Sequence, residues 1–358
     1  MHLLTGFPGF LGSALAGRLL ERTDDRLCCL VQSHYRDVAE RRAAALAAEA
    51  GVADDRIELV EGDITDPELA VDDYAALRDR TDAVSHLAAV YDLGVDRALA
   101  ERVNVDGTDH VLDFAVGAEV DRFHYVSTCY VSGRYDGTFT HRDLAVGQSF
   151  HNHYEATKFR AEVAVQERMA EGFPATVYRP AIAVGDSRTG ETQKFDGPYY
   201  LLKLVLRQRG VAFVPVPLRP RATRLNVVPR NFVVDAIDTL AASEDTAGEV
   251  YQLCNPHPPT IADLVRQFAR ATGKRVVPVR GTSGISKRSL ELFPGLAERL
   301  GVEPAALPYL SQPTTYTDEN TRRALSDTDV RCPLFDSYVE TLVEYAREHL
   351  DEDAGAMV

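Results

Sequence analysis

The sequence predicts an α/β protein with a doubly wound parallel sheet and a smaller, mostly C-terminal second lobe. In the first half of the chain, short apolar runs alternate with longer amphipathic stretches, which is the pattern of β-α-β units. A glycine-rich turn directly follows the first apolar run. The composition, 45% hydrophobic and 26% charged over 358 residues, is that of a globular protein long enough to bury a large core.

The expected strands are the short apolar runs. They span His2–Thr5, Leu27–Gln32, Ile57–Glu61, Ala83–Leu87, Arg122–Ser127, Ala175–Tyr178 and Val250–Cys254. The expected helices have apolar residues at helical spacing and span Leu11–Arg22, Asp37–Ala50, Arg97–Val116, Tyr154–Glu171, Tyr199–Arg209, Phe232–Ala242, Ile261–Thr272 and Ser286–Leu300. A parallel sheet of this kind is buried on both faces and binds ligands beyond the carboxyl ends of its strands. We therefore expect the functional site at that edge.

Composition excludes several classes of function. A formal net charge of −15 argues against a general affinity for nucleic acid, because phosphate backbones are bound by clustered Lys and Arg. Five cysteines without a C-x-x-C pair predict neither a disulfide framework nor a zinc site. His151 and His153 lack a third ligand at suitable spacing, so no metal is expected. No segment approaches the roughly 18 apolar residues of a membrane span, which predicts a cytoplasmic protein.

The segment TGFPGFLG places Gly6, Gly9 and Gly12 in a G-x-x-G-x-x-G spacing after the first strand. Gly6 would permit the tight turn, Gly9 would let the backbone approach a pyrophosphate, and Gly12 would let the helix sit close to the strand. The helix N-terminus would add free N–H groups for the phosphates. A merely structural turn is the alternative, but its place at the start of a β-α-β run favours a Rossmann-type dinucleotide site.

The domain boundaries follow from where this rhythm breaks, which is after Pro180. Residues 1–184 plus 231–254 are expected to form the dinucleotide-binding domain. Residues 185–230 plus 255–334 are expected to form one substrate lobe assembled from separate stretches. A closing helix is expected over 335–350 and a frayed tail over 351–358.

The end of the second strand bears on the choice of dinucleotide, since an acidic residue there would bind the ribose 2′-hydroxyl. Gln32 ends that strand without an acid beside it. Basic residues that would meet a 2′-phosphate follow closely: His34, Arg36, Arg41 and Arg42. The sequence therefore favours NADP(H) over NAD(H), unless these side chains form only a solvated helix face. Asp63, just past the third strand, would accept a hydrogen bond from the adenine amino group or would cap a helix.

Tyr154 and Lys158 are four residues apart in a stretch of helical periodicity, so both project from one face. Hydride transfer to a carbonyl leaves an alkoxide that needs a proton, and a phenol can supply it. An ammonium about 4 Å away would lower the phenol pKa of about 10 by up to roughly three units. Thr128 ends the fifth strand, where its hydroxyl would bind the substrate oxygen, with Ser127 as the alternative donor. A Tyr-x-x-x-Lys pair alone is a common surface pairing; together with Thr128 and the glycine turn it favours catalysis.

From Met1 to about Cys254, these motifs resemble the extended short-chain dehydrogenase/reductase superfamily. TGFPGFLG, HLAA, RVNVDGT, VSTCYVSG, YEATK and YRPAIAVGDSRTG are most similar to the branch of fatty acyl-CoA reductases and thioester reductase domains, the male sterility type of NAD-binding domain. The resemblance implies that Thr128, Tyr154 and Lys158 are catalytic. It also implies a cofactor site lined by Thr5, Gly6, Gly9, Phe10, Leu11, Gly12, Asp63, Ala88, Asn104 and Pro180.

Neighbouring residues extend the expected cofactor site, which then also includes Gln32, Arg36, Ile64, Leu87, Ala89, Tyr154 and Lys158. Two positions depart from the branch that the sequence resembles. It usually carries arginine where Gln32 stands, which puts the NADP preference in doubt, and alanine where Cys129 stands.

The leading hypothesis is an NAD(P)(H)-dependent oxidoreductase that transfers hydride to or from the carbonyl of a lipid-like aldehyde, ketone or acyl thioester. The thioester would arrive on coenzyme A or on a separate carrier protein. A nucleotide-sugar epimerase or dehydratase with tightly bound NAD is the first alternative, in which Arg219, Arg221 and Arg224 would bind the diphosphate. A dinucleotide-binding sensor without turnover is the second. The resembled superfamily suggests a homodimer formed through helices 97–116 and 154–171.

Overall fold

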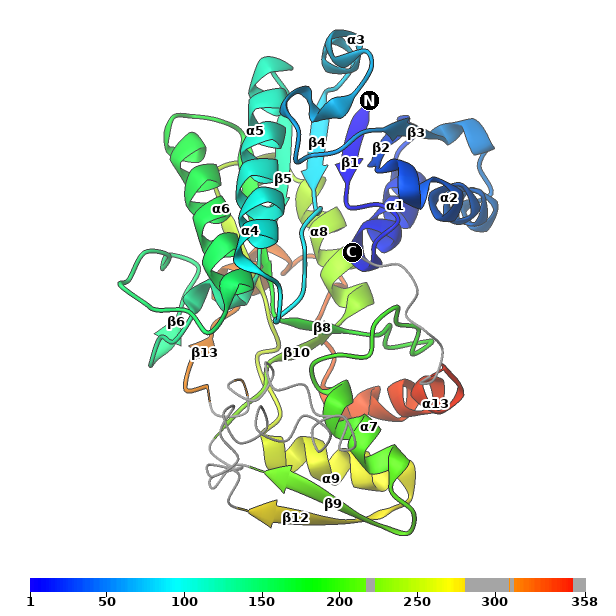
Figure 1. The fold of residues 1–358 in the computed structure, drawn as a ribbon, viewed down its shortest axis with the longest axis vertical. Helices are drawn as coiled ribbons and strands as arrows, with labels where there is room; N and C mark the ends of the chain where they lie inside the picture. Colours follow the sequence, from blue (N-terminus) through cyan, green and yellow to red (C-terminus); the bar gives the residue numbers. More distant parts are fainter. Residues whose placement is uncertain (217–222, 281–308, 310–311, 350–358) are drawn as a thin grey trace.

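A computed structural model describes residues 1–216, 223–280, 309 and 312–349. Its centre is a seven-stranded sheet in the order β11-β7-β5-β4-β1-β2-β3, with every neighbouring pair parallel (Figure 1). The strands are β1 (His2–Thr5), β2 (Leu27–Val31), β3 (Ile57–Glu61), β4 (Ala83–His86), β5 (Arg122–Val126), β7 (Ala175–Pro180) and β11 (Val250–Leu253). The strand order reverses between β1 and β4. A ligand site is expected at the carboxyl ends of these two strands.

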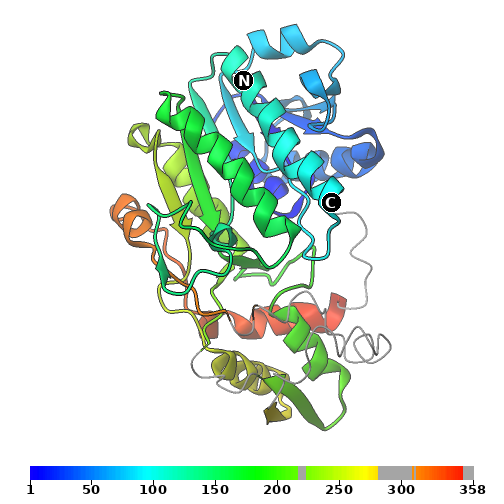
Figure 2. The ribbon, with the colours of Figure 1, turned by 60° about the vertical axis from the view of Figure 1, so that its left-hand side comes forward.

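Two layers of helices cover the sheet, and alternate residues of each strand face one layer or the other. Leu4 and Cys29 pack in one core with the helices α1 (Phe10–Arg22), α2 (Arg36–Ala50) and α8 (Arg230–Ala241). Leu3 and Cys28 pack in a second core with α3 (Tyr74–Asp79), α5 (Gly107–Gly117) and α6 (His153–Ala170). Helix α4 (Arg97–Ala100) runs into α5 through a π-helical stretch, η4 (Glu101–Asp106). Figure 2 shows α5 and α6 lying side by side across their face of the sheet.

The second lobe lies beyond the carboxyl edge of the sheet (Figures 1 and 2). It contains α7 (Tyr199–Arg207), β9 (Val211–Val216), α9 (Ile261–Thr272), β12 (Arg275–Arg280) and α13 (Val339–His349). Leu202, Val214, Leu264 and Val343 belong to its separate apolar core. The pair β8 (Ile182–Val184) and β10 (Val227–Pro229) lies between the lobe and the main sheet. Shorter elements are β6 (Thr138–Phe139), β13 (Thr315–Tyr316), α12 (Glu319–Ala324) and the 3-10 turns η1 (Ser33–Tyr35), η2 (Asp54–Arg56), η3 (Pro67–Ala70), η5 (Cys129–Ser132), η6 (Glu244–Thr246) and η9 (Phe335–Ser337).

The predicted doubly wound α/β fold is confirmed. The strands β1 and β3 and the helix α9 have the expected bounds. The sequence did not reveal the pair β9 and β12, which run parallel with Pro215 and Pro278 inside them. Proline cannot donate a hydrogen bond within a β-sheet and is mostly found in edge strands, so a proline in each segment argued against a strand there. The helix expected at 286–300 and the tail 351–358 lie outside the described residues.

Helices in the described part of the chain are too short or too polar to cross a bilayer. All five cysteines are free. Among the described residues no group of three or more His, Cys, Asp or Glu side chains is arranged to hold a metal ion.

Candidate active site

A pocket opens at the carboxyl edge of the sheet, where strands β1, β2, β4, β5 and β7 end. Most residues expected at the cofactor and the proton pair line it: Thr5, Gly6, Gly9, Phe10, Leu11, Gly12, Gln32, Asp63, Ile64, Leu87, Ala88, Ala89, Thr128, Tyr154, Lys158 and Pro180. Arg36 and Asn104 are the two expected residues outside this lining. Residues from Thr5 to Pro180 thus meet in one cavity, because parallel strands bring their ends to one edge.

The glycine turn is tightly built. Gly6 has φ +89°, and its carbonyl accepts a hydrogen bond from Gly9 N at 2.9 Å. A Cβ on Gly12 would lie 2.2 Å from the same carbonyl oxygen, so the helix approaches the strand as closely as a glycine allows. No side chain caps α1 at Gly9. The N–H groups of its first turn therefore remain available to an anionic ligand such as a pyrophosphate.

Thr5 fixes this turn against the neighbouring strand. Its hydroxyl oxygen accepts hydrogen bonds from the backbone N of Leu87 and Ala88, both at 3.2 Å, and lies 2.7 Å from Nδ1 of His86. The ends of β1 and β4 are thereby held together around the point where the sheet order reverses. The close backbone packing at Ala88 explains why small side chains follow β4.

At the other end of the pocket, Gln32 and Asp63 contact each other. The Gln32 amide donates to Oδ2 of Asp63 at 2.6 Å, and Oδ1 accepts from Thr65 N at 2.8 Å. Asp63 therefore holds its own turn in place and presents a carboxylate to the pocket. Arg36 instead lies at the surface, where it pairs with Glu40 at 2.7 Å.

Asn104 supports the site from behind. It lies in η4 and is 1% exposed. Its Oδ1 accepts from Val90 N at 2.9 Å, and its Nδ2 donates to Oγ1 of Thr157 at 3.0 Å. The side chain thus joins the loop after β4 to α6, the helix that carries Tyr154. Asn104 therefore belongs to the framework behind the pocket and not to its lining.

The predicted trio comes together at the junction of β5 and α6. Tyr154 and Lys158 are both buried on α6, whose N-cap is Asn152. The Tyr154 hydroxyl hydrogen-bonds with Thr128. The rings of Tyr91 and Tyr154 pack in a T-shaped arrangement, with their centroids 5.0 Å apart. Lys158 Nζ donates to the carbonyl of Val126 at 2.9 Å.

The electrostatics of this pair differ from the expectation. Burial raises the pKa of Tyr154 above its usual value, and the hydrogen bond with Thr128 offsets only part of that rise. Burial also lowers the pKa of Lys158 to about 7, while the charge of Glu162 raises it. The expected lowering of the phenol pKa by Lys158 is therefore not found, because loss of solvent dominates for both groups and the ammonium is bonded to a carbonyl. Tyr154 is held protonated, as a proton donor must be.

Sequence reasoning missed the part of the pocket beyond Tyr154. Tyr91, Tyr130, Lys194 and Asp196 line it. Lys194 donates to the carbonyl of Tyr91 at 2.9 Å and lies 3.8 Å from the Asp196 carboxylate, and burial raises the pKa of Asp196 to about 6. Tyr91, Lys194 and Asp196 stand in loops outside the quoted motifs, and Tyr130 lies on η5, so only the folded chain brings the four together.

Of the arginines considered for a sugar diphosphate, Arg224 donates to the carbonyl of Pro258 at 2.9 Å. Arg219 and Arg221 lie outside the described residues.

The fold and this site together define an NAD(P)-dependent oxidoreductase of the extended short-chain dehydrogenase/reductase type. More narrowly, the chain belongs to the Male sterility protein family of NAD-binding domains, whose model matches residues 4–237. The branch that the sequence motifs suggested is thus confirmed.

Two curated relatives are large proteins. A linear gramicidin synthase of Brevibacillus parabrevis is 26% identical over 278 residues, which cover 74% of this chain and 5% of the synthase. Carboxylic acid reductase of Mycobacterium marinum is 26% identical over 285 residues, covering 71% of this chain and 24% of the reductase. The crystal structure of the terminal R domain from the myxalamid PKS-NRPS pathway overlays with a TM-score of 0.83 at 26% identity, covering 99% of this chain and 92% of that one. The chain spans a quarter or less of the two curated relatives.

Proposed function

We propose that this chain reduces an acyl thioester to an aldehyde with NADPH, the acyl group being lipid-like and carried by coenzyme A or a carrier protein. The observation that carries the proposal is the buried Tyr154 hydroxyl, hydrogen-bonded with Thr128, in the pocket that begins at the glycine turn. The thioester is suggested by the relatives, since one is named a carboxylic acid reductase and the similar solved structure is an R domain of a synthase pathway.

The residues divide the chemistry among them. A nicotinamide dinucleotide, when bound, supplies the hydride. As the thioester carbonyl carbon accepts hydride, its oxygen gains negative charge and takes the proton of the Tyr154 hydroxyl, and Thr128 donates a hydrogen bond to the same oxygen. The resulting hemithioacetal loses the thiol and leaves the aldehyde. Lys158, one helical turn further along α6, donates to the carbonyl of Val126 and so places its ammonium group beside the site.

The part of the pocket beyond Tyr154 supports an apolar acyl group. Tyr91, Tyr130, Ile182 and Ala183 line it beside the Lys194–Asp196 pair. Ile182 and Ala183 belong to β8, which leads into the second lobe. We propose on this basis that residues 185–230 plus 255–334 form the substrate lobe and residues 1–184 plus 231–254 the dinucleotide-binding domain.

Preference for NADP(H) is supported by two arginines that share one carboxylate, and one of them, Arg230, lies over the ring of Phe10. Arg42 on α2 and Arg230 on α8 both approach the single carboxylate of Glu191, at 3.4 and 3.1 Å. The Arg230 guanidinium lies 5.2 Å from the centre of the Phe10 ring. Within the described part of the chain, Arg42 Nε and Arg230 Nη1 are buried without a hydrogen-bond partner. Two cations sharing one anion, with N–H groups to spare, suit an additional phosphate.

The test is a substrate panel with the purified chain. A long-chain acyl-CoA, the matching acyl-pantetheine, the free aldehyde and a nucleotide sugar are each incubated with NADPH and with NADH, and loss of reduced nicotinamide is followed by absorbance. We expect consumption of NADPH with the thioesters and appearance of free thiol in equal amount. Turnover of the nucleotide sugar alone, with cofactor retained through purification, would replace this function by that of an epimerase.

A further inference from the structure

Helix α6 presents three polar side chains to the end of β5, each one helical turn after the last. They are Tyr154, Lys158 and Glu162, and all three are buried. Each meets one of three consecutive residues on the strand end, which are Thr128 for Tyr154, Val126 for Lys158 and Ser127 for Glu162. The mechanism uses the first two of these contacts. The third has no part in it so far.

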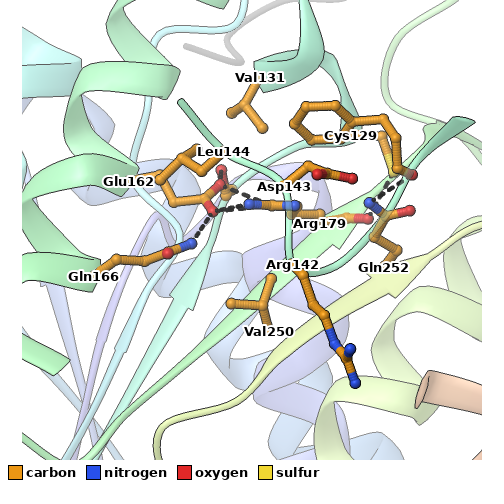
Figure 3. Close-up of polar contacts among 12 residues, drawn as sticks. Cys129, Val131, Arg142, Asp143, Leu144, Glu162, Gln166, Arg179, Val250 and Gln252 are labelled. Carbon is orange, nitrogen blue, oxygen red and sulfur yellow. Dashed lines mark hydrogen bonds and ion pairs between the residues drawn. The ribbon is translucent and has the colours of Figure 1, made fainter. Parts of the chain in front are cut away.

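Glu162 is held on its other side by an arginine from the next strand (Figure 3). The Arg179 guanidinium on β7 binds it through two nitrogens, with Nη2 at 2.6 Å and Nε at 2.9 Å from Oε1. Gln166, one turn further along α6, donates to the same oxygen at 2.8 Å. Both members of the ion pair are 0% exposed. The other carboxylate oxygen accepts the hydrogen bond from the Ser127 hydroxyl.

Such a pair is a poor device for stability. Removing two charges from water costs several kcal/mol for each, and apolar residues of similar volume often stabilise a protein equally well. Its geometry, however, joins three elements at one point, namely the end of β5, the middle of α6 and the end of β7. Arg179 is followed by Pro180, which lines the pocket. The pair therefore fixes how the helix that carries the proton donor sits on the strand that carries Thr128.

Glu162 is also the charge that acts on Lys158. Four ionisable groups near this lysine are neutral at pH 7, because burial lowers the pKa of the histidine to about 3 and raises those of the tyrosines: His86 on β4, Tyr125 on β5, Tyr130 on η5 and Tyr154 on α6. Glu155, three residues earlier on α6, bonds instead with His151 and Tyr309. Across the pocket, the Asp196 carboxylate is paired with Lys194. The Glu162 carboxylate forms its ion pair with Arg179, and the Lys158 ammonium bonds to the Val126 carbonyl. The carboxylate therefore acts on the ammonium through its charge and not through a direct hydrogen bond.

We propose that Glu162, held by Arg179, is a positioning residue of the reduction: through Ser127 it fixes α6 against the end of β5, and its negative charge favours the ammonium form of Lys158. The effect of Glu162 on turnover rests on the proposed function. Its effect on the charge of Lys158 can be measured without any substrate, so the inference and the proposed function can be refuted independently.

The chain contains only five lysines, which makes the charge of Lys158 directly observable. Protein with ¹³C at the lysine ε carbons is titrated by NMR, and the Lys158 signal is assigned from Lys158→Met. We expect Glu162→Gln to lower the pKa of Lys158 by roughly two pH units, the shift that a charge about 6 Å away causes at an effective dielectric of about 20. The Arg179 charge is present in both proteins, so it offsets part of this shift, about half, only in a variant that lacks Arg179 as well.

The matched control is Glu167→Gln, the same chemical change at an exposed position of the same helix. It should leave the Lys158 titration where it is. An unchanged titration in folded Glu162→Gln overturns the electrostatic part of the proposal. If that variant does not fold, the double variant Glu162→Met with Arg179→Met replaces the pair by apolar residues and takes its place. A titration that stays unchanged in the double variant has the same consequence.

Ser127→Ala tests positioning apart from charge, since it removes one hydroxyl and leaves the Glu162 carboxylate. We expect kcat for thioester reduction to fall about tenfold through misalignment of the reacting groups, with KM and the Lys158 titration little changed. A merely structural role would lower the stability and leave kcat intact. If kcat is unaffected, Ser127 and Glu162 do not position the site.

Discussion

Gly6 is where one added methyl group tests the cofactor turn most directly. Its φ of +89° lies in the left-handed region, and a Cβ there would be 2.8 Å from the backbone N of Ala88 and from the backbone C of Leu87. Both are main-chain atoms at the end of β4, so no side-chain rotation relieves the contact. Gly6→Ala therefore combines a left-handed alanine, about 1–2 kcal/mol, with overpacking, about 1–3 kcal/mol.

Gly51 provides the matched control. It follows α2 with φ +67°, and a Cβ there would meet no atom within 4 Å. Gly51→Ala thus carries the backbone cost alone and should lower the free energy of unfolding by about 1–2 kcal/mol. Gly6→Ala should lower it by about 2–5 kcal/mol, both measured by urea unfolding.

The two variants should also differ in cofactor binding. Gly6→Ala displaces the turn that presents the first N–H groups of α1, so affinity for reduced dinucleotide should fall at least about tenfold, the equivalent of losing one hydrogen bond to a charged group. Gly51 lies at the far end of α2, and its variant should bind as the wild type does. Fluorescence titration with NADPH measures both. Equal losses of stability and unchanged affinity in Gly6→Ala would refute the assignment of this turn.

Three further predictions concern the pocket itself. Tyr154→Phe should lower turnover by about 10²–10⁴-fold, since it removes the proton donor, while NADPH still binds; turnover at the normal rate would exclude Tyr154 as the donor. Arg42→Met should weaken NADPH about tenfold and leave NADH unchanged, whereas the exposed Arg41→Met should do neither; a loss shared by both dinucleotides would contradict a 2′-phosphate contact. Burial lowers the pKa of Lys158 to about 7 in the folded chain, below about 10.4 when unfolded. The unfolded state therefore binds more protons between these values, and wild-type stability gains with rising pH. Lys158→Met should thus have a higher free energy of unfolding than the wild type near pH 7, and the difference should shrink toward about pH 10. If urea unfolding gives the same difference at every pH, the burial of a charged Lys158 does not destabilise the wild type.

The sheet could be predicted well because its signals are local. Buried parallel strands are short apolar runs, and β1, β3 and α9 occur at their expected bounds. The second lobe gave weaker signals. Its strands β9 and β12 each carry a proline, and their pairing joins residues more than 60 positions apart. Periodicity within a short window carries no information about such a pairing.

The candidate site was predictable where a motif stands in one stretch of sequence, as in the glycine turn and the Tyr154–Lys158 spacing. It was not predictable where function depends on burial. The expected effect of Lys158 on the Tyr154 pKa assumed partial access to solvent, and the loss of that access reverses the direction. Asn104 illustrates the same limit. The motif RVNVDGT singled it out as a site residue, but its contact with Thr157 depends on how η4 packs against α6.

Buried polar contacts join elements around the pocket that are distant in sequence. Thr5 joins β1 to β4, Asn104 joins the loop after β4 to α6, and Glu162 joins β5, α6 and β7. A satisfied polar network in a low dielectric rigidifies its surroundings, whereas a half-satisfied one is costly. The two cores between the sheet and its helices consist mainly of apolar side chains, and further polar side chains such as His124 and Thr176 are buried on the strands. These contacts therefore hold the strand ends, the glycine turn and the helix of the proton donor at fixed distances from one another.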